Sequence, residues 1–172
     1  AIDLDLAAGS IERVIGGVGD DRFLGGDAAE TIAGGDGADQ LFGGDGADHL
    51  YGGSGDDTIA IDEDDAVIDA GTGRDTLNAA GAGDAVVIDL AVTGAEYVVG
   101  SQFGDRLDGA DADDVLDGRA GADSLSGGAG DDTLFFDADD VVVLGGEGYD
   151  VADASGSSSG VWIDLASGEI ES

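Results

Sequence analysis

Residues 34–60 consist of three successive nine-residue segments, GGDGADQLF (34–42), GGDGADHLY (43–51) and GGSGDDTIA (52–60). Each follows the frame G-G-x-G-x-D-x-U-x, in which U is apolar. Continued in both directions, the frame gives slots that start at residues 16, 25, 34, 43, 52, 61, 70 and 79, and then at 100, 109, 118, 127, 136, 145 and 154. A nonapeptide repeat therefore covers nearly the whole chain.

Two positions of the frame confirm its phase. The eighth position is apolar in all fifteen slots. The sixth position holds aspartate in eleven of them: Asp21, Asp39, Asp48, Asp57, Asp75, Asp84, Asp105, Asp114, Asp123, Asp132 and Asp150. Chance does not place eleven aspartates at one phase of a repeat.

The nonads form two runs, 16–87 and 100–162, and each run is part of a longer repeat. Each run follows a twelve-residue spacer, LDLAAGSIERVI (4–15) or IDLAVTGAEYVV (88–99), and a third spacer begins at Ile163. The spacers predict a strand followed by a turn. They divide the chain into a first module (1–87, nonads 16–87), a second module (88–162, nonads 100–162) and the start of another spacer (163–172). We expect the chain to belong to a longer array whose neighbouring repeats continue the stack.

The frame predicts an all-β fold. Glycine at positions one, two and four permits positive φ and a tight turn. Positions seven to nine predict a short strand whose middle side chain points inward. Two nonads would complete one coil, and turns on the same side would stack about 4.8 Å apart. The expected architecture is a parallel β-solenoid with two short sheets.

The charge of the chain limits its partners and its stability. Forty acidic residues oppose five basic ones, which gives a net charge of −35, and there is no cysteine. This composition excludes a disulfide framework and a nucleic-acid surface, and no apolar run is long enough for membrane insertion. One inward apolar residue per nonad contributes about 2 kcal/mol at best, whereas ordering nine residues costs about 1 kcal/mol each. The chain is then either an acidic disordered spacer or a fold that needs a cation.

The repeat chemistry favours calcium as that cation. Glycine-rich turns expose backbone carbonyls, and the aspartate at position six adds a carboxylate. Ca²⁺ accepts six to eight such oxygens, whereas Mg²⁺ gives up its water reluctantly. Zinc is disfavoured because the chain has no cysteine and only His49 as an imidazole ligand.

The nonapeptide resembles the RTX (repeats-in-toxin, hemolysin-type) calcium-binding repeat, over all fifteen slots and the spacers. This resemblance implies a right-handed parallel β-roll of two stacked modules, with calcium between turns on the same side and the eleven position-six aspartates as ligands. Asp84 is the least regular of these, because its turn is poor in glycine. We expect about six to nine calcium ions. The resemblance also implies ligands among the turn glycines, through their carbonyls: Gly17, Gly19, Gly35, Gly37, Gly44, Gly46, Gly53, Gly55, Gly71, Gly73, Gly121, Gly128, Gly130, Gly146 and Gly148.

Four slots depart from the frame. Slot 25–33 has Ala28 and Glu30 in place of glycine and aspartate, and slot 154–162 is rich in serine and is predicted to end the second roll. Slots 61–69 and 136–144 lack the glycines but are acidic, and they either hold ions in a different way or form solvated turns. Their acidic residues at equivalent places are Asp62, Asp64 and Asp65, and Asp137, Asp139 and Asp140.

These features predict a calcium-triggered folding module without catalytic activity. Residues 156–160 match G-x-S-x-G, but a nucleophile elbow needs a histidine and an acid nearby, and His49 is the only histidine. By resemblance, the parent protein is secreted or displayed at the cell surface through type I secretion, as an adhesin, toxin, protease or lipase. The alternative is a carbohydrate-binding auxiliary module of an RTX enzyme. The expected partners are calcium ions and neighbouring repeats, with no nucleic acid and no membrane insertion.

Overall fold

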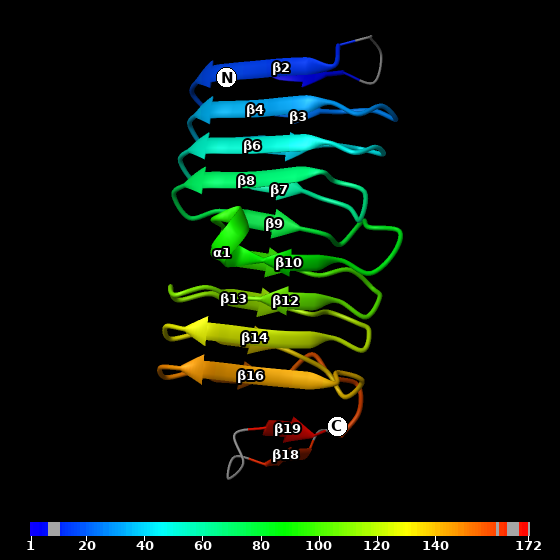
Figure 1. Cartoon of the computed structure of the whole chain (residues 1–172), viewed down its shortest axis with the longest axis vertical. Helices are drawn as coiled ribbons and strands as arrows, with labels where there is room; N and C mark the ends of the chain where they lie inside the picture. Colours follow the sequence, from blue (N-terminus) through cyan, green and yellow to red (C-terminus); the bar gives the residue numbers. More distant parts are fainter. Residues whose placement is uncertain (7–10, 161, 165–168, 172) are drawn as a thin grey trace. The chain divides into compact units, whose positions relative to one another are not determined.

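The computed structural model describes residues 1–6, 11–160, 162–164 and 169–171. Nearly all of its elements are short parallel strands, stacked coil upon coil within each of two compact units (Figure 1). Unit 1 comprises Ala1–Gly81 with Val92–Ala95, and unit 2 comprises Ala82–Ala91 with Glu96–Ser172. The chain is thus a β-solenoid, as the repeat predicts.

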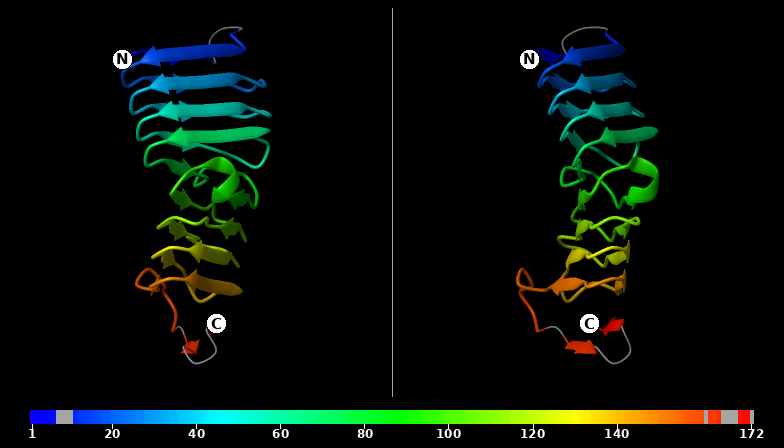
Figure 2. Two further views of the ribbon diagram at one scale, coloured as in Figure 1. Left: turned by 60° about the vertical axis from the view of Figure 1, so that its left-hand side comes forward. Right: turned by 90° about the vertical axis from the view of Figure 1, so that its left-hand side faces the viewer.

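Unit 1 has two sheets of parallel strands, which face each other across each coil (Figure 2). The first sheet has three-residue strands in the order β1 (Asp3–Asp5), β3 (Arg22–Leu24), β5 (Gln40–Phe42), β7 (Thr58–Ala60) and β9 (Thr76–Asn78). The second sheet has six-residue strands in the order β2 (Arg13–Val18), β4 (Thr31–Asp36), β6 (His49–Ser54) and β8 (Val67–Thr72).

Unit 2 repeats this plan. Its three-residue strands follow the order β11 (Tyr97–Val99), β13 (Val115–Asp117), β15 (Thr133–Phe135) and β17 (Val151–Asp153). The facing sheet is ordered β10 (Val87–Asp89), β12 (Arg106–Asp108), β14 (Ser124–Ala129) and β16 (Val142–Glu147). The remaining elements are the helix α1 (Leu90–Thr93) and an antiparallel pair, β18 (Trp162–Asp164) and β19 (Glu169–Glu171).

The register confirms that two nonads make one coil. Phe23 pairs with Leu41, Leu41 with Ile59, and Ile59 with Leu77, each 18 residues further along. These position-eight side chains are fully buried and form the core of the solenoid. Two position-eight residues depart from the pattern, since Ile68 is half-buried and Ala152 is exposed. Val161 lies outside the described residues.

The strand length differs from the prediction on one face of each unit. The strand β4 does not stop at position nine of its nonad but continues through the next three residues. Its pairing with β2 continues over this extension, where Gly35 pairs with Gly17. Gly35 has a φ of 114°, which keeps its backbone within reach of the neighbouring coil. The prediction of three-residue strands is therefore correct for one sheet of each unit and for β10 and β12, and it is too short for the six-residue strands β2, β4, β6, β8, β14 and β16.

The spacers form the predicted strands. β1 contains Leu4, β10 contains Ile88 and β18 contains Ile163, each at the start of its spacer. After β10 the chain forms α1 rather than a simple turn. No helix in the described ranges has the length and apolar character that crossing a bilayer requires.

Candidate metal sites

The turn glycines divide into two groups with different roles. All fifteen glycines at positions two and four that were singled out as turn ligands have positive φ, from 93° at Gly19 to 146° at Gly73. L-residues rarely adopt this conformation, so the frame requires glycine there. The position-one glycines do not have positive φ, and the expectation of positive φ at that position is wrong. Glycine is needed at position one because of close packing.

Each position-one glycine leaves space for oxygen atoms. A Cβ built at Gly16, Gly52, Gly100, Gly109 or Gly127 would lie under 3.0 Å from two oxygens. One is a carboxylate oxygen of the aspartate in the same nonad, and the other is the position-one carbonyl of the next coil on that side. An ion that touches both atoms needs Ca–O distances of about 2.3–2.6 Å. We call each such pair of oxygens a cradle.

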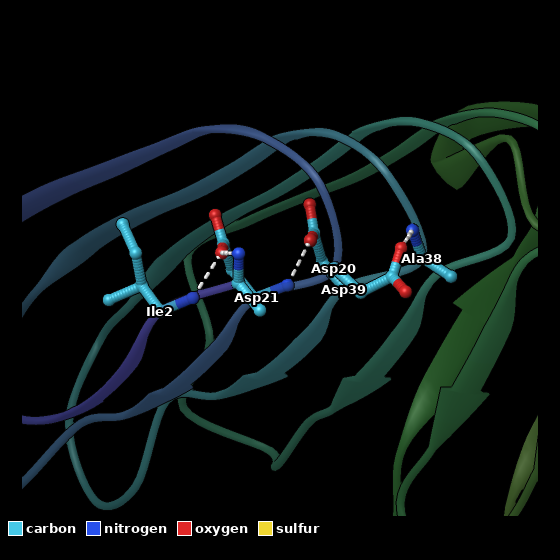
Figure 3. Close-up of polar contacts among 6 residues, drawn as sticks. Ile2, Asp20, Asp21, Ala38 and Asp39 are labelled. Atoms are coloured by element: carbon cyan, nitrogen blue, oxygen red, sulfur yellow. Dashed lines mark hydrogen bonds and ion pairs between the residues drawn. The ribbon is translucent and has the colours of Figure 1, made fainter.

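The aspartates at position six form a column along each side of a unit. The backbone N–H of Asp21 donates to Oδ1 of Asp39 at 2.8 Å, and the N–H of Asp39 donates to Oδ1 of Asp57 at 2.8 Å. Figure 3 shows the start of this column, where Asp21 in turn accepts from the N–H of Ile2. The N–H of Asp57 donates to Asp75 in the same way. One carboxylate oxygen of Asp39, Asp57 and Asp75 is thus fixed by the coil before it.

The second oxygen of most column aspartates is buried without a hydrogen-bond partner among the described residues. These atoms are Oδ2 of Asp21, Asp39, Asp48, Asp57, Asp123 and Asp132, and Oδ1 of Asp114. A buried ionised oxygen without a partner carries a large desolvation cost. A divalent cation would remove that cost, so the residues present fit a calcium ion.

Burial also raises the pKa values of these carboxyl groups. Desolvation raises the pKa of Asp57 and of Asp114 to about 6, and the neighbouring aspartates of each column add to the shift. The pKa values of Asp39 and Asp132 are raised by the same cause. The folded chain without metal therefore disfavours the charged form at the positions where an ion would favour it.

Side chains alone do not form a metal site. Within the described ranges, no group of three or more histidine, cysteine, aspartate or glutamate side chains is placed to hold an ion. An ion between two turns would take most of its ligands from backbone carbonyls and the rest from column carboxylates. This donor set suits Ca²⁺, which accepts carbonyl oxygens in flexible geometry.

Four of the predicted ligands are less suited to this arrangement. Asp84 is exposed and lies in no column, and its slot begins with Ala79. Asp75 is buried in the column, but Ala70 at position one puts a Cβ where the other nonads have a cradle. Asp105 and Asp150 depart in other ways.

Both carboxylate oxygens of Asp105 accept hydrogen bonds, from the backbone N–H and the hydroxyl of Ser101 and from the N–H of Val86. Asp150 is half-buried and accepts from the N–H of Asp132. Coordination of an ion by Asp105 would therefore compete with three hydrogen bonds that already exist.

The sequence reasoning missed a second column. The position-five aspartate Asp20 accepts from the N–H of Ala38, and Asp56 accepts from the N–H of Arg74, each in the next coil. Asp113 and Asp131 do the same in unit 2. The Asp-Asp dipeptides of these nonads are the signal that could have predicted it.

The sequence of the chain matches the model of one known repeat family. The model of the RTX calcium-binding nonapeptide repeat (4 copies) matches residues 8–40, 24–59, 91–125, 99–134 and 108–143, which together span more than half of the chain. The chain belongs to the RTX calcium-binding nonapeptide repeat family. The calcium-binding character of this RTX chain follows from that membership. Most of its column aspartates lie on the matched nonads, whereas Asp75 and Asp150 lie outside them. The search of curated proteins found no match to the RTX chain.

Proposed function

We propose that this RTX chain is a calcium-dependent folding module that stays unfolded in the cytosol and folds after type I secretion, without catalytic activity of its own. The observation that carries the proposal is the column of buried carboxylates, in which Asp21, Asp39, Asp48, Asp57, Asp114, Asp123 and Asp132 each have an oxygen that lacks a hydrogen-bond partner among the described residues. Such a column is repulsive without metal, and its cost falls when cations occupy the cradles. The position-six aspartates of the columns are the proposed ligands, together with carbonyls of the adjacent turns.

The coupling of calcium binding to folding supports a chain that is unfolded in the cytosol and folded outside the cell. Calcium sites of extracellular modules have a Kd of about 10⁻⁴–10⁻³ M. At a calcium concentration ten times Kd, each occupied site contributes about 1.4 kcal/mol to folding. About eight ions would also neutralise about half of the net charge of −35. At submicromolar calcium both contributions vanish, and the acidic chain stays expanded.

Circular dichroism of the chain in chelator and in millimolar calcium tests the proposal. The expected result is a coil spectrum in chelator and a β spectrum in calcium. Millimolar Mg²⁺ serves as the control for charge screening, and we expect it to leave the coil largely unchanged. With all samples at pH 8, where the column carboxylates are ionised, a β spectrum in chelator, or equal folding in Mg²⁺, would contradict the proposal.

One observation favours the carbohydrate-binding alternative. Unit 2 has a hollow of about 530 Å³ whose lining includes Arg119, Phe135 and three aspartates. The aromatic ring offers a face for a sugar ring, and the carboxylates repel acidic polysaccharides. Binding of neutral glycans in calcium, abolished by Phe135→Ala, would support this second function.

A further inference from the structure

The hollow of unit 2 combines an aromatic ring with an excess of negative charge. It has a volume of about 530 Å³, and its lining includes Phe135, Arg119, Asp117, Asp137 and Asp153. Phe135 stands at position nine of its nonad, next to the inward position eight, so its half-buried ring lies on the outer face of β15. The three aspartates outnumber the one arginine, and the hollow is therefore attractive to a cation.

The ring of Phe135 lies between two carboxylates on the neighbouring strands. In the register of the sheet, Asp117 of β13 pairs with Phe135, and Phe135 pairs with Asp153 of β17. Paired residues of adjacent strands lie about 4.8 Å apart on the same face of a sheet. Oδ1 of Asp117 accepts from the N–H of Arg119 at 3.1 Å, and Oδ1 of Asp153 accepts from the N–H of Ser155 at 2.7 Å. These bonds orient both carboxylates, and those from Ser155 lower the pKa of Asp153, which favours its charged form.

The corresponding ring of unit 1 already carries a cation of the chain itself. The guanidinium of Arg22 lies over the ring of Phe42, also at position nine, at 5.2 Å from its centroid. A cation over an aromatic face is attracted by the negative face of the ring. Val115 takes the place of Arg22 in the register of unit 2. Among the described residues, no cation lies over the ring of Phe135.

The neighbours of the two rings differ in the same sense. Phe42 pairs with Leu24 and Ala60, which carry no charge. The hollow at this place in unit 1 has a volume of about 230 Å³, less than half of that beside Phe135. The ring that lacks an internal cation is thus the one that has carboxylates on both sides and more space in front of it.

We propose that the hollow around Phe135 binds an organic ammonium group, with the cation over the ring and between Asp117 and Asp153. The inference goes beyond the proposed function and needs only the folded chain. A volume of about 530 Å³ is in the range of small-molecule sites, which favours a small amine as the ligand. A metal ion is a poorer fit, because no group of three or more acidic side chains in the described ranges is placed to hold one.

Nuclear magnetic resonance of the ¹⁵N-labelled chain, folded in calcium, tests the proposal with three probes. Glucosamine carries an ammonium group on a sugar ring, N-acetylglucosamine keeps the ring without the charge, and butylammonium keeps the charge without the ring. The titrations are made below the pKa of the amines and in about 0.15 M salt, which screens general attraction to the acidic chain. We expect the amines, and not N-acetylglucosamine, to shift the backbone amides of residues 117–119, 135–137 and 153–155. The amine that binds more tightly identifies the source of the ammonium group.

Variants of the lining should change the affinity for the amines in opposite directions. Phe135→Leu and Asp153→Asn should each weaken binding about threefold, and Leu24 shows that leucine fits at position nine. Arg119→Gly removes the positive charge of the hollow and should tighten binding about threefold. Asp111→Asn is the control, because it removes one charge from an exposed residue outside the hollow and should leave the affinity unchanged.

Three results would overturn the proposal. The first is the absence of shifts at the hollow with either amine, and the second is equal binding of N-acetylglucosamine, which would indicate a neutral sugar. The third is an equal loss of affinity in Asp111→Asn and Asp153→Asn, which would indicate general attraction to an acidic chain. Circular dichroism of the same samples separates this inference from the proposed function. A chain that folds in calcium without binding amines refutes only the inference, whereas a chain that calcium does not fold refutes both.

Discussion

The glycine-rich turns and the two glycine-free turns close the chain between strands, and bond to the preceding coil, in different ways. In the regular nonads, glycines with positive φ shape the turn, and the aspartate at position six reaches the N–H one coil earlier. In slot 136–144 a carboxylate closes the turn, and Asp140 at position five reaches the N–H of Asp123 instead. The strand register stays the same, since Ser124 still pairs with Val142. The column of carboxylates, more than the glycine frame, is the feature that both kinds of turn maintain.

The largest expected effect is a stepwise response of the metal-free chain to pH. Burial raises the pKa values of Asp65, in a glycine-free turn, and of Asp123, on the coil beside the other one, to about 7, and those of Asp57 and Asp114 to about 6. A carboxyl with a raised folded-state pKa binds its proton in the folded state while the unfolded chain remains ionised. The folded state in chelator therefore gains stability as pH falls from about 7 to about 4, and loses it as pH rises again.

Circular dichroism in chelator between pH 8 and pH 4 measures this response. We expect β structure to appear as the pH falls, with the first gain near pH 7 and a second near pH 6. A coil spectrum over the whole range would show that repulsion within the columns does not limit folding.

A methyl group at position one should abolish one regular site. Gly52→Ala puts a Cβ under 3.0 Å from the Asp57 carboxylate and from the carbonyl of Ala70. We expect a loss of about 1–3 kcal/mol of stability in calcium, as for overpacked interiors, and one calcium ion fewer by calorimetry. Gly81→Ala is the control, because nothing lies within 4 Å of a Cβ there. An unchanged calcium count in Gly52→Ala would contradict the cradle.

The variant Asp57→Asn removes the charge of one column carboxylate and keeps an oxygen for its hydrogen bond. The amide oxygen can still accept from the N–H of Asp39, so the effect depends on calcium. At calcium ten times Kd the variant should lose about 1.4 kcal/mol, and in chelator it should lose nothing. Asp56→Asn, at the exposed neighbour, is the control for net charge. Urea unfolding in calcium measures the loss, and a loss for Asp57→Asn no larger than that for Asp56→Asn would refute the assignment.

The smallest expected effect concerns Arg119. It is the one non-glycine residue in the described chain with positive φ, at 69°, and it stands at position two, where Gly44 has 94°. Arg119→Gly should stabilise the folded chain by about 1 kcal/mol, because the left-handed conformation costs an L-residue about that much. Thermal unfolding in calcium measures it. Destabilisation would mean that the arginine side chain contributes contacts worth more than the strain.

The coil, the core and the columns could be predicted from the sequence because the repeat is local and strict. Position eight must be apolar to fill the core, and position six must reach the turn one coil away. The locations of residues such as Leu41 and Asp39 can therefore be predicted from their positions in the frame. The role of position-one glycine could not be predicted, because it depends on how closely the next coil approaches. The same holds for Asp65 and Asp140, whose turns close through side-chain bonds that no glycine marks.

A crystal structure of the chain grown in calcium tests the central claim most directly. The account predicts anomalous density for calcium in the cradles, each ion touching an Oδ2 atom such as that of Asp21, Asp57 or Asp132 and the position-one carbonyl of the next coil. Well-ordered columns with water or no density at those oxygens would contradict it.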